Sequence, residues 1–443
     1  MSGDRLGILA TAGAVIFGRK GRWHARWTAG ALFVLSLVVY RMVTVPATVN
    51  RLDNEWYVPT SLSLIEEGNT DLSEFVEIKG FRRSYRIKRL DDQVYNFYPI
   101  GTSLVILPLV AVGQEIYWDV PHPKKSRLLA DLIADFLAAT SVALFFLVAV
   151  KLGVSGRLGI LGALLFAFAT QHFSIHAGGL WSHNTTSFLF LVAGWCSLQS
   201  SSRLGWVAGL AAALAVLSRP TAVLWVGLLG LYLCWQNRRQ LLGYISVLVG
   251  AGGLFVIWAL SIYGHWLPPY YQQKTLSFGH FWEALALHLV SPNRGLLVFT
   301  PIFLLSLVGG FLVLRRRSEY APFYLLALAF MVVQWLFIAT FEKWAGGWSY
   351  GPRLMVESVP AWGLLLLPSL EGVLQLSRWR KALAVAVVGL LTATSFFVQY
   401  RGVTDKTVYE WNKKPHRVGR HSHRMWDWSD MQIFRDSEYR EKK

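Results

Sequence analysis

Hydrophobic residues along this chain form stretches of about 20 residues separated by short polar segments. A helix of that length crosses a hydrocarbon core of about 30 Å, and its backbone polar groups are satisfied within the segment. The short alternating segments of a membrane barrel are not seen. The pattern predicts an all-α polytopic membrane protein of about eleven transmembrane helices. The predicted spans are 28–47, 126–150, 157–175, 184–200, 204–218, 221–236, 241–263, 295–314, 320–340, 355–372 and 382–399.

Basic residues fall in alternate short loops between these spans, and such loops usually face the cytoplasm. The residues concerned are Lys151, Arg157, Arg203, Arg238, Arg239, Arg315 to Arg317, Arg378, Arg380 and Lys381. This distribution predicts a cytoplasmic N-terminal segment at 1–27, a transmembrane domain at 28–399 and a C-terminal tail at 400–443 on the outer face. The tail is itself basic, so a change of one span in the count would place it in the cytoplasm.

Composition supports a membrane protein and argues against nucleic-acid binding. Hydrophobic residues make up 54% of the chain and charged residues 16%, whereas a soluble domain has about a quarter charged. The net charge is +17, but no nucleic-acid-binding module accompanies it. The basic residues instead set topology and meet anionic membrane lipids. Cys196 and Cys234 lie in apolar stretches, which gives no reason to expect a disulfide.

A long first outer loop at 48–125 precedes the second span. Within it, Thr102 to Val112 is apolar but too short to cross the membrane, so it predicts an interfacial or re-entrant helix, with Trp118 at headgroup level. A second outer loop is predicted at about 264–294. Spans 204–218 and 221–236 are short and are separated by a Ser-Arg-Pro-Thr segment, which suggests a broken or shallow pair.

Two carboxylates, Asp53 and Glu55, begin the first outer loop. A partly desolvated carboxylate there could act as a general base on an acceptor hydroxyl. The two could also coordinate a divalent cation. The plain alternative is a solvated loop start with an ion pair to Arg51.

Three outward cations, Arg294, Lys343 and Arg353, lie next to apolar segments. Arg can hold a phosphate through two parallel hydrogen bonds, and Lys binds it as a point charge. The alternatives are snorkelling of these side chains to lipid headgroups, or an ion pair between Arg353 and Glu357 one helical turn away.

The sequence also contains a cluster of three histidines, His172, His176 and His183. The first two have the i, i+4 spacing of zinc ligands on a helix, but no acidic general base lies between them. Hydrogen bonding within a cavity is the competing interpretation. Asp131 and Asp135 are also four residues apart, which is compatible with a proton relay or with ion pairs to nearby basic residues.

The chain resembles the GT-C superfamily of polyprenyl-phosphate-sugar-dependent glycosyltransferases, near the protein O-mannosyltransferases and the aminoarabinose-to-lipid-A transferases. Members carry an Asp-Glu-x-x-Tyr-like motif in the first outer loop. Asp53 stands four residues before Tyr57 and matches the Asp, while Asn54 replaces the Glu and leaves Glu55 as a substitute. The resemblance continues through Tyr98 to Ser103, Leu180 to Thr185, Ser218 to Thr221, Ser291 to Leu297, Trp344 to Arg353 and Trp426 to Asp430.

The resemblance implies transfer of a sugar from a polyprenyl-phosphate donor to an acceptor glycan, lipid or protein at the outer face of a bacterial inner membrane. It implies Asp53 as general base, an inverting displacement without a catalytic metal, and a donor phosphate held by Lys343, Arg353 and Arg294. The implied substrate cavity is lined by Tyr57, Tyr98, His183, Trp344 and Tyr350. The main alternative function is a transporter or flippase of a lipid-linked sugar, which would place its polar groups near the membrane midplane.

Overall fold

A computed structural model describes residues 19–44, 54–78, 86–116, 121–273, 276–315 and 318–436. Asp53, the predicted general base, lies outside these ranges, and so does Trp118. The predictions that concern these two residues therefore have no structural description.

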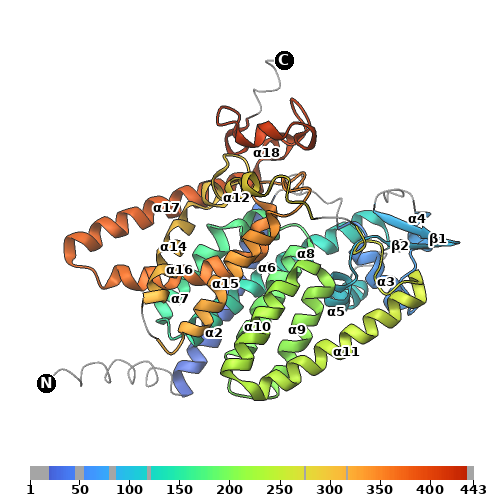
Figure 1. Ribbon diagram of the computed structural model, residues 1–443, viewed down its shortest axis with the longest axis horizontal. Helices are drawn as coiled ribbons and strands as arrows, with labels where there is room; N and C mark the ends of the chain where they lie inside the picture. The colour runs from blue at the N-terminus through green and yellow to red at the C-terminus, as the bar shows by residue number, and fades with distance from the viewer. Residues whose placement is uncertain are drawn as a thin grey trace.

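Each predicted span overlaps a helix of the structure (Figure 1), although the bounds differ by several residues at some ends. These helices are α2 (Arg19–Val43), α6 (Pro123–Lys151), α7 (Gly156–Phe168), α8 (Ser182–Ser197), α9 (Leu204–Ser218), α10 (Val223–Gln236), α11 (Arg238–Tyr263), α14 (Leu304–Arg315), α15 (Ala321–Ile338), α16 (Val359–Leu374) and α17 (Arg378–Thr404). Among the described residues, only six helices are both long and apolar enough to cross a membrane. The α9 and α10 helices have 15 and 14 residues, or about 22 Å, so the count of eleven crossings is not confirmed.

Several of the apolar segments are interrupted by irregular turns, and three of these turns begin at or directly after a proline, which has no backbone N–H to donate. A 3₁₀ turn at Pro220–Ala222 (η3) separates α9 from α10, which gives the predicted broken pair a structural basis. The helix α13 (Leu296–Phe299) and the turn Pro301–Phe303 precede α14. A 3₁₀ segment at Arg353–Ser358 (η5) precedes α16, and a π-helical turn at His172–His176 (η2) follows α7.

The described part of the first outer loop contains short helices and one small hairpin. The helices are α3 (Tyr57–Glu66), α4 (Ser73–Val76) and α5 (Gly101–Ile116). Strands β1 (Ile87–Leu90) and β2 (Gln93–Asn96) pair antiparallel. The predicted short helix at Thr102 to Val112 is therefore found as α5, and the hairpin is a small departure from an all-α fold. Since α5 packs against α3 and α9, it belongs to the bundle.

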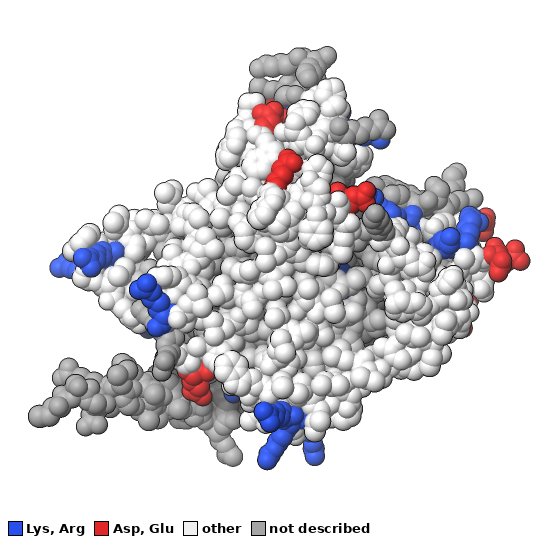
Figure 2. Space-filling view, in the orientation of Figure 1, with Lys and Arg blue, Asp and Glu red and all other residues white. Residues whose placement is uncertain are grey.

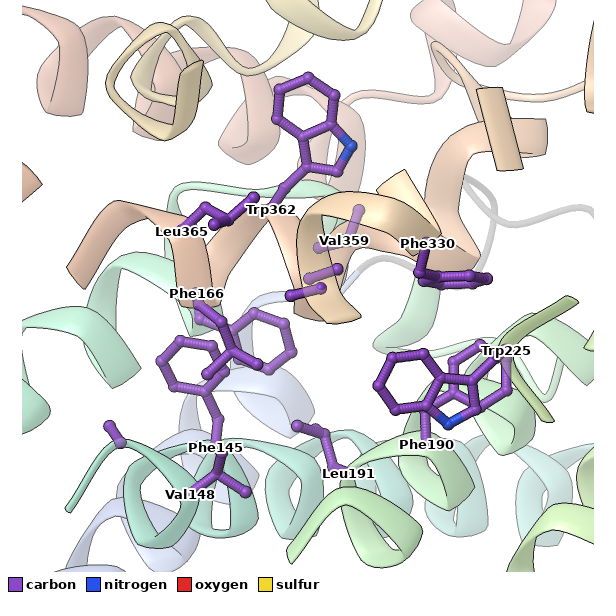
Figure 3. Packing of buried hydrophobic residues seen from close by; sticks show 14 of the residues in the cluster. Phe145, Val148, Phe166, Phe190, Leu191, Trp225, Phe330, Val359, Trp362 and Leu365 are labelled. Atoms are coloured by element: carbon purple, nitrogen blue, oxygen red, sulfur yellow. The ribbon is translucent and has the colours of Figure 1, made fainter. Parts of the chain in front are cut away.

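Aromatic side chains from several helices form the core of the bundle (Figure 3). Phe145 of α6 and Phe166 of α7 stack with their ring centroids 4.6 Å apart. Phe190 of α8, Trp225 of α10 and Phe330 of α15 form a triangle of rings 5.2–5.3 Å apart. The first contact joins α6 to α7, the others join α8, α10 and α15, and such pairs stabilise beyond simple burial.

The α11 and α17 helices present long apolar faces to the outside of the protein. In their most apolar windows only 6% of α11 and 17% of α17 are buried. Large exposed side chains on these helices include Leu242, Val249, Leu254, Ile257, Leu383 and Leu390. In the face shown in Figure 2, charged side chains gather at the margins of the bundle and leave a broad uncharged surface between them. Apolar surface of this extent indicates contact with lipid, and the protein is an integral membrane protein.

Residues 405–436 fold into a small unit, which we call the C-terminal cap, at one end of the bundle (Figure 1). It contains α18 (Lys406–Glu410) and three 3₁₀ turns at Val418–Arg420, Ser422–Trp426 and Gln432–Phe434. Trp411, Val418 and Met425 pack against Trp344 and against α12 (Phe281–Val290). The basic tail therefore shares one end of the bundle with the 264–294 and 343–353 loops.

Candidate active site

Glu357 occupies the centre of a buried polar cluster where η5 leads into α16. Its side chain is fully buried, and its carboxylate accepts hydrogen bonds from the Nε of Arg219 and, at 2.6 Å, from the hydroxyl of Thr221. The Nε2 of Gln334 on α15 lies 3.5 Å away. A buried carboxylate is tolerated only when it is paired in this way. The sequence offered Arg353 as an alternative partner of Glu357, whereas the structure pairs Glu357 with Arg219 and Thr221.

The break between α9 and α10 positions the two main partners of Glu357. Arg219 has extended backbone angles, φ −150° and ψ 122°, directly after the last residue of α9. Because Pro220 cannot continue the helix, Arg219 and Thr221 both leave the helical path and turn toward α16. Arg219 also donates from Nη1 to the hydroxyl of Ser182 at the start of α8, 3.2 Å away. The Ser-Arg-Pro-Thr segment thus ties three parts of the bundle together.

A chain of buried histidines extends from this cluster into the bundle. The Nδ1 of His183 lies 3.2 Å from the Glu357 carboxylate. The Nε2 of His172 lies 2.9 Å from the carbonyl oxygen of Ala138, so this nitrogen carries the proton. In a neutral His172 the Nδ1 is then the acceptor, and the Nδ1 of His176, 2.9 Å away, donates to it. These bonds support the predicted hydrogen-bonding role of the cluster.

Arg353 lies at the edge of the same cluster. Its guanidinium carbon is 4.6 Å from the ring centre of Trp181, a distance typical of a cation–π contact. Both Arg353 and Arg219 lie within electrostatic range of His183. Arg353 is half-buried, in contrast to the fully buried Glu357. The structure therefore brings two of the predicted site residues, His183 and Arg353, close together.

Aromatic rings from three segments form a wall beside Arg219. Tyr57 at the start of α3 is 6.3 Å from Tyr98, and Tyr98 is 5.9 Å from Tyr270, measured between ring centres. Tyr57 and Tyr270 both lie within electrostatic range of Arg219. Burial raises the pKa of the neighbouring Tyr271 well above its usual range, so its hydroxyl stays protonated. The predicted cavity residues Tyr57 and Tyr98 thus lie next to the Arg219 cluster.

Glu55, the predicted substitute for the second acid of the motif, is engaged elsewhere. Its carboxylate is buried and paired with Arg127 of α6, whose Nε donates to Glu55 Oε2 at 3.2 Å. Together with Asn54 and Asp131, these residues line a small cavity. Asp135, one helical turn beyond Asp131, accepts a hydrogen bond from the backbone N–H of Gly178 at 2.8 Å. The contact of Asp135 is consistent with a structural role for that acid, while the nearby Arg127 binds Glu55.

Arg294 has all five N–H donors bound to oxygen atoms of the protein. They reach the carbonyl oxygens of Asn293, Ala345 and Gly347 and the side-chain amide oxygens of Asn412 and Gln432, at 2.7–3.2 Å. The side chain is almost fully buried. In this arrangement Arg294 fastens the C-terminal cap to two loops and has no donor left for a phosphate.

The remaining predicted residues are divided between the surface and the core. Lys343 is exposed, and Trp344 is buried with its ring 5.4 Å from that of His280. Tyr350 is buried, and its hydroxyl donates to the carbonyl oxygen of Val398 at 2.7 Å. Trp344 and Tyr350 therefore pack beneath the loop that carries Lys343 and Arg353, instead of lining an open cavity.

Sequence reasoning did not identify Arg219, Thr221 and Tyr270 as site residues. The available signal was the Ser-Arg-Pro-Thr break, because a cation placed between two short apolar spans is costly unless a buried acid meets it. No group of three or more His, Cys, Asp and Glu side chains within the described ranges could hold a metal ion.

The fold is shared with an archaeal oligosaccharyltransferase from Archaeoglobus fulgidus. One solved structure, with a tethered acceptor peptide, matches with a TM-score of 0.54 at 11% identity, over 91% of this chain and 59% of that one. A second, in complex with an inhibitory peptide and a dolichol-phosphate, matches with a TM-score of 0.55 at 11% identity, over 94% of this chain and 61% of that one. No protein-family description and no curated protein matches the chain. The likeness shows that the chain shares the fold of this oligosaccharyltransferase, and this chain spans about three fifths of those chains' length.

Proposed function

We propose that this protein transfers a sugar from a polyprenyl-phosphate donor to an acceptor hydroxyl at the outer face of a membrane. The observation that carries the proposal is the cluster of Arg219, Arg353, Glu357 and His183 at a broken-helix junction, in a chain with the fold of an oligosaccharyltransferase. The oligosaccharyltransferase structure contains a dolichol-phosphate, which supports a lipid phosphate as the class of donor.

The junction is suited to anion recognition at the end of the bundle that carries the cap. The α9 and α10 helices lie side by side and run in opposite directions (Figure 1), so the Arg219 turn lies at the other end from Arg203 and Arg238, which are exposed where α9 begins and where α10 has ended. Under the rule that basic loops face the cytoplasm, the cluster faces outward. Glu357 holds the Arg219 guanidinium in a fixed position, so the cation is in place before a substrate binds.

The proposed reaction is a direct displacement at the anomeric carbon. The acceptor oxygen forms a bond to that carbon while the bond between the carbon and the phosphate oxygen breaks. The bonding electron pair leaves with the polyprenyl phosphate, and Asp53 takes the proton of the acceptor hydroxyl. Attack from the face opposite the phosphate inverts the anomeric configuration.

Arg353, assisted by Lys343, stabilises the negative charge that develops on the departing phosphate. Trp181 lies against the guanidinium of Arg353 and fixes its plane, which favours a two-point contact with phosphate oxygens. Arg294 is left out of this step because its donors are all used by the protein.

The test is mass spectrometry of cell-envelope glycans and lipids from a deletion strain complemented with variants. We expect wild type to restore a species heavier by one sugar. Asp53→Asn should reduce its formation by about 10²–10⁴-fold and Arg353→Gln by about 10²–10³-fold. Arg353→Lys should restore part of the activity because it keeps the charge and loses the paired donors.

The matched control is Arg157→Gln, which removes an exposed arginine from the first turn of α7 and should behave as wild type. The proposal fails if Asp53→Asn and Arg353→Gln, present in the membrane at wild-type levels, both restore the wild-type profile. Accumulation of unreacted lipid-linked sugar on the inner leaflet of the deletion strain, without loss of polyprenyl-phosphate release, would favour a flippase instead.

A further inference from the structure

The C-terminal cap contains an open pocket of about 520 Å³ that the proposed reaction does not use. All of its lining residues belong to the cap, between Pro415 and Asp436. Its volume falls in the range of about 300–1,000 Å³ that is common for small-molecule sites. The pocket is therefore large enough to hold a ligand.

Two large aromatic side chains at this pocket are exposed. Trp428 is 61% and Phe434 is 64% exposed, whereas Trp411 in the same small unit is fully buried. The cap lies at the end of the bundle beyond the helices that contact lipid (Figure 1). Exposed aromatic rings in such a position offer flat apolar faces to a ligand, as aromatic residues do at the centres of binding interfaces.

Most of the remaining lining is polar and carries both signs of charge, with Pro415 and Met431 as its apolar members. Asp427 and Asp430 supply carboxylates, Arg435 supplies a guanidinium, and His416 and His423 supply imidazoles. Asp427 Oδ1 accepts hydrogen bonds from the hydroxyl and N–H of Ser429 and from the N–H of Asp430. The Ser429 hydroxyl bond in particular lowers the pKa of Asp427, so this side chain stays an ionised acceptor.

This mixture matches the chemistry of a sugar ring. Sugar hydroxyls both donate and accept hydrogen bonds, which suits a wall of mixed carboxylates, imidazoles and guanidinium. The C–H face of the ring is apolar and can lie against Trp428 or Phe434. An anionic ligand would favour a wall of mainly basic groups, and an acyl chain would favour an apolar one.

The pocket is held in a fixed place relative to the candidate active site. Asp430 binds Arg424 at 2.9 Å and Arg435 at 2.6 Å, which makes the pocket wall rigid. Gln432 accepts a hydrogen bond from the backbone N–H of Gly351, 3.1 Å away and two residues before Arg353. The cap, and the pocket within it, is thus hydrogen-bonded to the same loop that carries Arg353.

From these observations we infer that the cap binds an oligosaccharide, and that the acceptor of the reaction is a glycan. The identification of the acceptor as a glycan rests on the proposed function. The glycan-binding site itself is inferred from the pocket alone. The cap would hold sugar residues of the acceptor while its terminal hydroxyl reaches the donor.

The test is binding of the purified full-length protein in nanodiscs to an array of neutral and acidic oligosaccharides. We expect wild type to bind at least one class of oligosaccharide, and Trp428→Ala combined with Phe434→Ala to weaken that binding at least tenfold. Both side chains are exposed, so the melting temperature should not change. The matched control is Trp266→Ala, which removes an equally exposed tryptophan (65%) from the loop at 264–294, outside the pocket.

The inference is overturned if wild type binds no oligosaccharide on the array, or if the double variant binds as tightly as wild type. Capture of acceptor peptides with no glycan binding would also overturn it. Failure of the proposed function is separate: it would appear as absence of polyprenyl-phosphate release by wild type while glycan binding and its loss in the double variant remain.

Discussion

The variant Arg294→Lys tests whether Arg294 binds the donor phosphate or holds the C-terminal cap in place. The guanidinium makes five hydrogen bonds, and a lysine ammonium has three donors. At least two charge-assisted bonds are lost, each worth about 1.5–3 kcal/mol. The free energy for opening the cap should therefore fall by about 3–6 kcal/mol, up to the limit of complete release.

Amide hydrogen exchange of residues 405–436 measures this opening. A loss of that size corresponds to exchange faster by about two to four powers of ten, since each 1.4 kcal/mol is about tenfold. The bundle helices, which Arg294 does not contact, should exchange as in wild type. The matched control is Arg417→Lys, because Arg417 is an exposed residue of the same cap.

The structural role of Arg294 would be refuted by cap exchange that changes less than tenfold. If at the same time the KM for the lipid-phosphate donor rises, Arg294 is a phosphate ligand, as the sequence suggested. Faster cap exchange with loss of transfer would instead mean that the cap positions the acceptor.

Two further predictions concern packing and pH. Gly309→Ala on α14 should destabilise the protein by about 1–3 kcal/mol in thermal unfolding, because the new Cβ would lie 1.8 Å from the carbonyl oxygen of Leu365. The control is Gly250→Ala, since Gly250 has open space around it. Equal melting temperatures of the two variants would contradict the prediction. His288 on α12 is buried next to Arg294, and burial first, then that cation, lowers its pKa to about 3. Its neutral form is favoured by folding, so its contribution is complete above the unfolded pKa of about 6.5 and is lost as pH falls toward 3. His288→Leu should flatten the acid unfolding of the protein over this range, and an unchanged pH profile would exclude His288 as a cause of it.

Much of the fold could be predicted from local patterns. Every predicted span contains a helix, and Thr102 to Val112 is the short helix α5, because hydropathy and length act within one segment. The number of crossings could not be predicted in the same way. Hydropathy predicts α9 and α10 as two membrane spans, yet both helices are short and are joined by a turn at Pro220.

The candidate site was predictable in chemical type but not in its partners. The sequence indicated that His183 and Arg353 would lie at one end of the bundle, and the structure places them in one cluster with Arg219 and Glu357. Local spacing offered a pair between Arg353 and Glu357, four residues apart, as one alternative to phosphate binding by Arg353. The actual partner is Arg219, 138 residues away, because a proline-broken helix turns it toward α16.

By itself, the sequence determined that this is a helical membrane protein, because the cost of placing polar backbone in lipid is decided residue by residue along an apolar stretch. The sequence also determined which end of each helix carries charge. Only the tertiary structure decided which charges meet. In the folded protein Arg294 binds the cap, Glu55 pairs with Arg127, and Arg219 pairs with Glu357. A buried charge takes the partner that packing places within reach, and packing depends on contacts between segments far apart in the chain.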